Sequence, residues 1–118
     1  MPELNFNLNG LRMNATTTAP GGVIDSDTVF TFTQDGPHAE AHYAGGRVLS
    51  GHLIGTITRD RFEFRYCQRH ATPDGSGQEL AGGHSRCTLE RDDLGKLRIL
   101  ERFTWADGGT GENIIAEL

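Results

Sequence analysis

Residues 61–70 read Arg61-Phe62-Glu63-Phe64-Arg65-Tyr66-Cys67-Gln68-Arg69-His70, a run in which aromatic and charged side chains alternate. Because successive side chains of a β-strand point to opposite faces of the sheet, this alternation predicts a strand with one buried face. No window of about a dozen residues has the period of an amphipathic helix. The chain is therefore predicted to be all-β, with further strands over residues 28–34, 38–44, 47–58, 78–90, 96–105 and 112–118.

Short turns rich in Asp and Gly separate these segments. Near the start, residues 4–8 and 11–15 flank Asn9-Gly10, which predicts a hairpin with a type I′ turn. Short sequential turns produce an antiparallel meander of about eight to ten strands, and such a sheet either closes or leaves two edges exposed. We expect a closed up-and-down barrel formed by a single domain, residues 1–118; a β-sandwich is the alternative.

Charge and composition exclude several classes of partner. The formal net charge is −5, with 11 basic residues against 16 scattered acidic ones, which argues against nucleic-acid binding. No apolar run approaches the roughly 18 residues of a membrane span, and the opening Met1-Pro2-Glu3 lacks the features of a secretory leader. We therefore expect no membrane association and a cytoplasmic location.

Neither cysteines nor histidines predict a structural cross-link or a metal site. Cys67 and Cys87 are too few for a disulfide framework, and the register of residues 78–90, which decides whether they are neighbours, stays open. His38, Glu40 and His42 share one face of a predicted strand, but the two histidines would lie about 13 Å apart, too far to hold one ion. We expect no metal. No Gly pair carries the features of a phosphate-binding loop, so no cofactor is expected either.

Strand parity predicts an interior that is aromatic with a few polar side chains. On residues 61–70 the inward face would carry Phe62, Phe64 and Tyr66 together with Gln68 and His70. An aromatic lining with a few polar groups is what a small apolar or amphipathic ligand requires. The predicted ligand-binding residues are Phe30, Phe32, Phe64, Tyr66, Gln68, Glu101, Phe103 and Trp105.

Glu101 is the most informative of these residues, because it lies mid-strand among inward apolar positions. A carboxylate there must be paired, or else face water or a ligand. One interpretation is a structural carboxylate that is bonded to Arg, His, Tyr or water, or turned outward by a bulge. The other is a functional acid whose pKa is raised by desolvation.

Several short motifs resemble a family of small bacterial proteins that often carry the name N-acetylglutamate synthase. They include Gly45-Gly46-Arg47-Val48, Gly51-His52-Leu53-Ile54-Gly55, Arg65-Tyr66-Cys67-Gln68, Gly95-Lys96-Leu97-Arg98-Ile99 and Glu101-Arg102-Phe103-Thr104-Trp105, within a similarity that spans roughly Phe30 to Glu117. The resemblance implies a small calycin-like or lipocalin-like β-barrel with no defined set of catalytic residues. N-acetylglutamate synthesis itself is not expected, because acetyl-CoA-dependent acetyltransferases hold the pyrophosphate with a Gly-rich loop before a helix.

Three functions are compatible with these observations. The first is a barrel that binds a small apolar ligand. The second is a small-molecule cyclase, isomerase or hydratase with Glu101 as acid or base and Tyr66, His52 or His84 orienting the substrate, although the sequence favours a protein without enzymatic activity. The third is a homodimer or interaction module. Its contact face would use Leu100 and alternate members of Leu49, Leu53 and Ile57.

Overall fold

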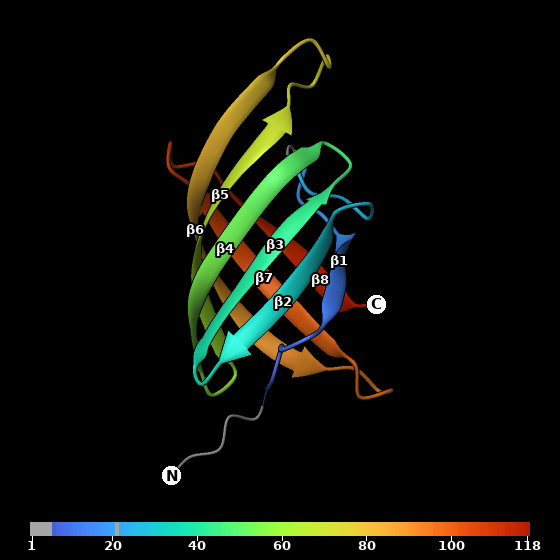
Figure 1. The fold of residues 1–118 in the computed structure, drawn as a ribbon, viewed down its shortest axis with the longest axis vertical. Coiled ribbons are helices and arrows are strands. Elements are labelled where there is room, and N and C mark those ends of the chain that lie inside the picture. Colours follow the sequence, from blue (N-terminus) through green and yellow to red (C-terminus); the bar gives the residue numbers. More distant parts are fainter. Residues whose placement is uncertain (1–5, 21) are drawn as a thin grey trace.

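A computed structural model describes residues 6–20 and 22–118 and shows eight antiparallel strands closed into a barrel (Figure 1). This confirms the predicted barrel and excludes the sandwich. Each strand pairs with the next along the chain, as a meander requires. The strands are β1 (Arg12–Thr17), β2 (Val29–Asp35), β3 (His38–Gly45), β4 (Val48–Thr58), β5 (Arg61–Ala71), β6 (Gln78–Arg91), β7 (Leu97–Trp105) and β8 (Thr110–Glu117).

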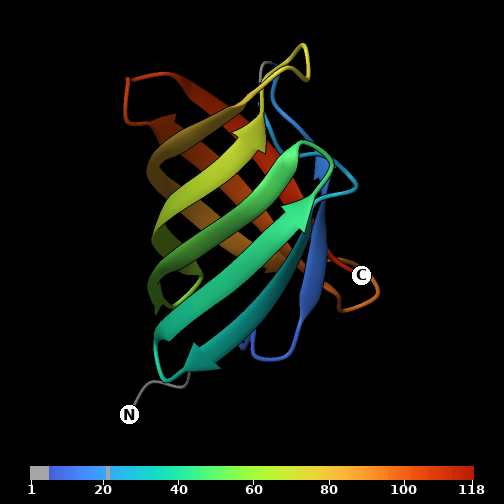
Figure 2. The same ribbon diagram turned by 45° about the horizontal axis from the view of Figure 1, so that its top comes forward.

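The barrel is closed by the pairing of the first strand with the last. Ala15 of β1 lies opposite Ile115 of β8, and a bulge follows between Ala15 and Thr17. We call the end of the barrel that carries the β1–β2, β3–β4, β5–β6 and β7–β8 connections the upper end, which faces up in Figure 1 and comes forward in Figure 2. The other three connections and residues 6–11 lie at the lower end.

The predicted N-terminal hairpin is wrong. Leu4 and Asn5 lie outside the described residues, and residues 6–8 form no strand. Asn9-Gly10 does form a turn, closed by the Leu11 amide donating to the Leu8 carbonyl at 3.0 Å. Gly10 has a φ of +80°, but Asn9 does not have the positive φ that a type I′ turn needs at both central residues. The chain instead crosses the lower end, where Leu8 is fully buried.

The alternation of buried and exposed positions is confirmed along β5 and most of β7. It fails in β4, where the register against β5 shifts between Val48 and Ser50. This bulge turns Leu49 outward, 41% exposed, while Leu53 and Ile57 point inward and are 1% exposed. Leu53 and Ile57 therefore belong to the core, and the prediction that they contribute to an outer contact face is wrong.

The two cysteines lie on opposite faces of the barrel wall. Cys67 pairs with Gly82 and is exposed, whereas Cys87 pairs with Phe62 and is buried. Both are free thiols, so the register that would have made them neighbours does not occur. Among the described residues there is no helix long and apolar enough to cross a membrane.

Candidate functional site

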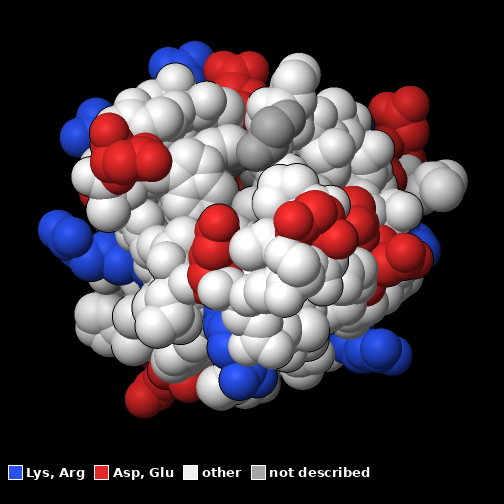
Figure 3. Space-filling view, turned by 90° about the horizontal axis from the view of Figure 1, so that it is seen from above, with Lys and Arg blue, Asp and Glu red and all other residues white. Residues whose placement is uncertain are grey.

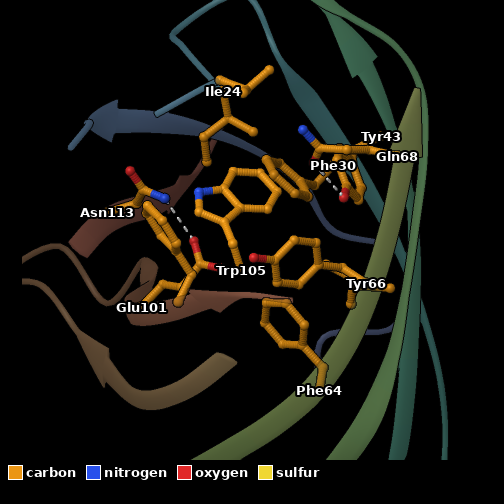
Figure 4. Close-up of a pocket in the computed structure, with 12 residues that line it drawn as sticks. Ile24, Phe30, Tyr43, Phe64, Tyr66, Gln68, Glu101, Trp105 and Asn113 are labelled. Atoms are coloured by element: carbon orange, nitrogen blue, oxygen red, sulfur yellow. Dashed lines mark hydrogen bonds between the residues drawn. The ribbon is translucent and has the colours of Figure 1, made fainter. Parts of the chain in front are cut away.

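The barrel encloses a small cavity in its upper half (Figure 4). Its volume is about 30 Å³, which is room for a water molecule but not for an organic ligand. Ile24 of the β1–β2 connection lies over it, and the side chain of Trp105 lies across it. The neighbouring Val23 also lines it. The remaining lining residues come from β2 to β5, β7 and β8: Phe30, Tyr43, Leu53, Phe64, Tyr66, Gln68, Glu101, Phe103 and Asn113.

Seven of the eight residues predicted to bind a ligand line this cavity. The exception is Phe32, which is fully buried below it and contacts the edge of the Phe62 ring at a centroid distance of 6.4 Å. Sequence reasoning missed the other five lining residues, which are Val23, Ile24, Tyr43, Leu53 and Asn113. Tyr43 shares its strand parity with the buried Ala39 and Ala41, which was a signal for an inward ring. The sequence contained no comparable signal for Asn113.

Glycines on neighbouring strands make room for three of the aromatic side chains. Gly51 lies opposite Tyr43, Gly83 opposite Tyr66, and Gly111 opposite Phe103. A Cβ atom at any of these glycines would overlap the facing side chain. These glycines within the strands therefore allow close packing of aromatic rings against the backbone.

Glu101 is the buried carboxylate of the cavity, and two neutral side chains bind it. The Ser85 hydroxyl lies 2.7 Å from Oε2, and the Asn113 amide donates to Oε1 at 2.9 Å. The partners are therefore not the Arg, His, Tyr or water that the structural interpretation expected. They come from the strands on either side, since Ser85 is in β6 and Asn113 pairs with Glu101 across β7 and β8.

Hydrogen bonding determines where a proton on Glu101 would reside. The Asn113 Oδ1 atom accepts from the Ala19 amide at 3.0 Å, so the NH₂ group of Asn113 must face Glu101. Oε1 is thus an acceptor in both charge states, and a proton would sit on Oε2 and donate to Ser85. Burial raises the pKa of Glu101, and the bonds from Asn113 and Ser85 oppose that shift only in part.

The other titratable groups around Glu101 stay protonated near neutral pH. Burial raises the pKa of Tyr43 and of Tyr66, and the Glu101 carboxylate raises both further. Burial also raises the pKa of the Cys87 thiol. Burial raises the pKa of Glu101 as well, which moves it from its ordinary acidic value toward neutral pH.

A second polar chain leads from the cavity to the surface. The Tyr43 hydroxyl donates to Gln68 Oε1 at 2.9 Å, and Gln68 Nε2 lies 3.2 Å from His70 Nδ1. His70 Nε2 is in turn 3.4 Å from Glu79 at the upper end. Because an amide NH₂ can only donate, Nδ1 of His70 accepts and its proton is on Nε2. These bonds satisfy Gln68 and hold the Tyr43 ring in place.

The histidines considered as acid, base or metal ligands lie on the outer surface. His52 and His84 both point away from the cavity, so neither can orient a substrate there, and that prediction is wrong. His52 stacks on His42 at a centroid distance of 4.5 Å and lies 3.9 Å from Glu40. Within residues 6–20 and 22–118 no group of three or more His, Cys, Asp or Glu side chains could hold a metal ion.

The upper end of the barrel is acidic. Its connections carry Asp25, Asp27, Asp74 and Asp107 against one basic residue, Arg47. Hydrogen bonds from Ser76 and Thr72 hold the pKa of Asp74 at about 2, so this carboxylate is ionised at all working pH values. Seen from above, acidic side chains lie near the centre of this end and at its outline, and one basic group lies beside the central acidic one (Figure 3).

A family comparison identifies this architecture. The model of the Avidin-like protein family matches residues 6–118, which include every strand and every residue of the cavity. The chain belongs to the avidin-like protein family. Neither a search of curated proteins nor one of solved structures found a significant match. The avidin-like barrel agrees with the small β-barrel that the sequence resemblance implied, and the family match has no bearing on the name N-acetylglutamate synthase.

Proposed function

We propose that this avidin-like barrel binds a small apolar or amphipathic ligand in its upper cavity. The observation that carries the proposal is the contrast inside the cavity, where six aromatic rings surround the polar groups of Gln68, Glu101 and Asn113. Binding sites for small molecules have this composition, with apolar walls for affinity and a few polar groups for orientation. An interior selected for stability alone would have no need of a buried carboxylate.

A ligand must displace part of the cover, because the cavity of about 30 Å³ is smaller than any organic ligand. The cover consists of side chains that are only partly buried, namely Ile24 and Trp105. They pack against the buried core and remain partly exposed to solvent. We infer that the ligand occupies the space that these side chains vacate and that Trp105 then packs against it.

Native mass spectrometry of the untagged protein from its own host tests this function. The intact mass is expected to exceed the denatured mass by that of a small molecule. Leu53→Phe adds bulk at a cavity position that is 1% exposed and should abolish this excess, whereas Leu94→Phe, at a position 84% exposed, should not. A protein that is always empty under gentle preparation, and that no apolar compound stabilises, would contradict the proposal.

The same spectra test a second candidate, the association of two copies. The outer faces of β6, β7 and β8 carry a row of half-buried side chains formed by Thr88, Leu100 and Ile114. Ion pairs flank this row on both sides, Arg102 with Glu112 and Arg98 with Glu90. An apolar centre with a charged border suits a self-associating face. A strictly monomeric mass at micromolar concentration would contradict this second candidate.

An enzymatic use of Glu101 stays a prediction. The carboxyl group lines the cavity and could exchange a proton with a bound substrate through Oε2. Glu101→Gln would then abolish turnover and leave the fold intact.

A further inference from the structure

Among residues 6–20 and 22–118, no positively charged side chain binds Glu101. Its two oxygen atoms are bound by neutral groups, Ser85 and Asn113. Among the described residues that line the cavity there is no Lys, Arg or His. His70 does not line the cavity, although its ring lies 6.5 Å from the Trp105 ring, measured between centroids. A buried carboxylate without a counterion is unfavourable, and one that lines a cavity can be compensated by a cation arriving with a ligand.

The rings beside Glu101 form the walls of an aromatic enclosure. The centroid of the Trp105 ring lies 5.4 Å from that of Tyr66, with an angle of 73° between the ring planes. The corresponding values for Trp105 and Phe103 are 5.5 Å and 64°. Rings at such steep angles to one another form a corner, and Figure 4 shows the Trp105 and Tyr66 rings beside the Glu101 carboxyl group. Aromatic faces attract organic cations, and quaternary ammonium ligands are held in proteins by enclosures of this kind.

The upper end of the barrel, through which a ligand would reach the cavity, also favours a cation over an anion. The connections at the upper end contain four aspartates against one arginine, Arg47, which lines the depression beside Trp105 together with Asp107. An opening lined mainly by charges of one sign raises the local concentration of ligands of the opposite charge. Anionic ligands would meet repulsion first at this mouth and again at Glu101.

We propose that the ligand of this barrel carries an organic cation, an alkylated or quaternary ammonium group, which lies against Tyr66, Phe103 and Trp105 and faces the Glu101 carboxylate. This inference rests on the proposed function and specifies the chemical class of its ligand. The class follows from three independent features of the upper half, namely the buried carboxylate without a counterion, the ring enclosure and the acidic mouth.

Three probes of nearly equal shape and different charge test the proposal. They are choline, its neutral isostere 3,3-dimethylbutan-1-ol, and the anion 3,3-dimethylbutanoate. Trp105 is the single tryptophan of the chain and lies in the cavity, so its fluorescence reports binding directly, with calorimetry as a second readout. We expect choline to bind at least about tenfold more tightly than the alcohol, and the anion to bind most weakly.

Two charge-neutralising variants separate the role of Glu101 from that of overall charge. Glu101→Gln keeps the shape and both hydrogen bonds, and should weaken choline binding about 10- to 100-fold while changing the affinity for the alcohol by less than about threefold. Glu112→Gln removes the same charge from the outer face, where Glu112 is exposed, and should leave all three affinities unchanged.

Several outcomes would overturn this inference. They are no binding of choline, equal binding of choline and the alcohol by the wild-type protein, preference for the anion, or loss of both choline and alcohol binding in Glu101→Gln. The comparison of probes on the wild-type protein decides the question even if the variant fails to fold. A ligand mass in the native spectra together with any of these results would leave the barrel a binding protein and refute only the cationic class.

Discussion

The lower and upper halves of the barrel are built from the same strands and differ in what they enclose. Below, Phe32, Phe62, Leu89 and Ile99 are at most 2% exposed, and apolar side chains fill the interior. Above, the same strands contribute polar groups around a cavity, among them Gln68 on β5 and Glu101 on β7. The difference indicates that stability is concentrated below and that the upper half is free to carry a binding site.

The largest expected effect comes from truncating one phenylalanine in each half of β5. Phe62→Ala in the lower half should reduce the free energy of unfolding by roughly 3–5 kcal/mol, because Phe62 is fully buried and nothing can fill its space. Phe64→Ala should be clearly less destabilising, since Phe64 already lines a cavity. Urea denaturation measures both. Equal losses would show that the two halves are equally well packed.

A smaller loss of stability is expected where an aromatic ring of the upper half packs directly against a glycine of the neighbouring strand. Gly51→Ala should destabilise the protein by about 1–3 kcal/mol, because the new Cβ overlaps the Tyr43 ring. Combining it with Tyr43→Leu should recover part of that loss, as the smaller side chain relieves the overlap. Gly77→Ala is the control, since its nearest neighbour would be Thr72 Cγ2 at 3.8 Å. Additive losses in the double variant would refute the contact.

The smallest expected effect is a pH dependence that belongs to Glu101. Its pKa is raised by burial from an ordinary value of 4.5, so the folded state holds the proton more tightly than the unfolded chain does. The resulting stability is fully present below pH 4.5 and is lost as pH rises through the pKa of the folded state. Relative to Glu101→Gln, the wild-type protein should therefore become less stable as the pH rises.

Thermal unfolding of both proteins between pH 4 and pH 8 measures this difference, because subtracting the variant removes the contributions of all other groups. The neighbouring Tyr43, Tyr66 and Cys87 do not titrate in this range, since burial raises the pKa of each. A wild-type protein that gains stability relative to the variant as pH rises would show that Glu101 is instead favoured as a carboxylate.

Much of the fold and part of the site could be predicted because both depend on local alternation. The run over residues 61–70 predicted β5 and the inward direction of Phe64, Tyr66 and Gln68. The alternation over residues 96–105 likewise placed Glu101 and Trp105 inside. The failures occurred where local rules were interrupted, at the bulge that turns Leu49 outward and at the turn of Asn9-Gly10.

The amino-acid pattern alone determined an antiparallel meander and, apart from the N-terminal segment and residues 47–58, its strands and their inward faces, because a period of two is a property of each strand by itself. The tertiary structure decided which side chains meet across strands, since pairing depends on register and closure. Asn113 opposite Glu101, Gly51 beneath Tyr43 and Ile24 over the cavity all join residues that belong to different elements. That Glu101 lacks a counterion among the described residues can be recognised only from the positions of the groups around it in the folded chain.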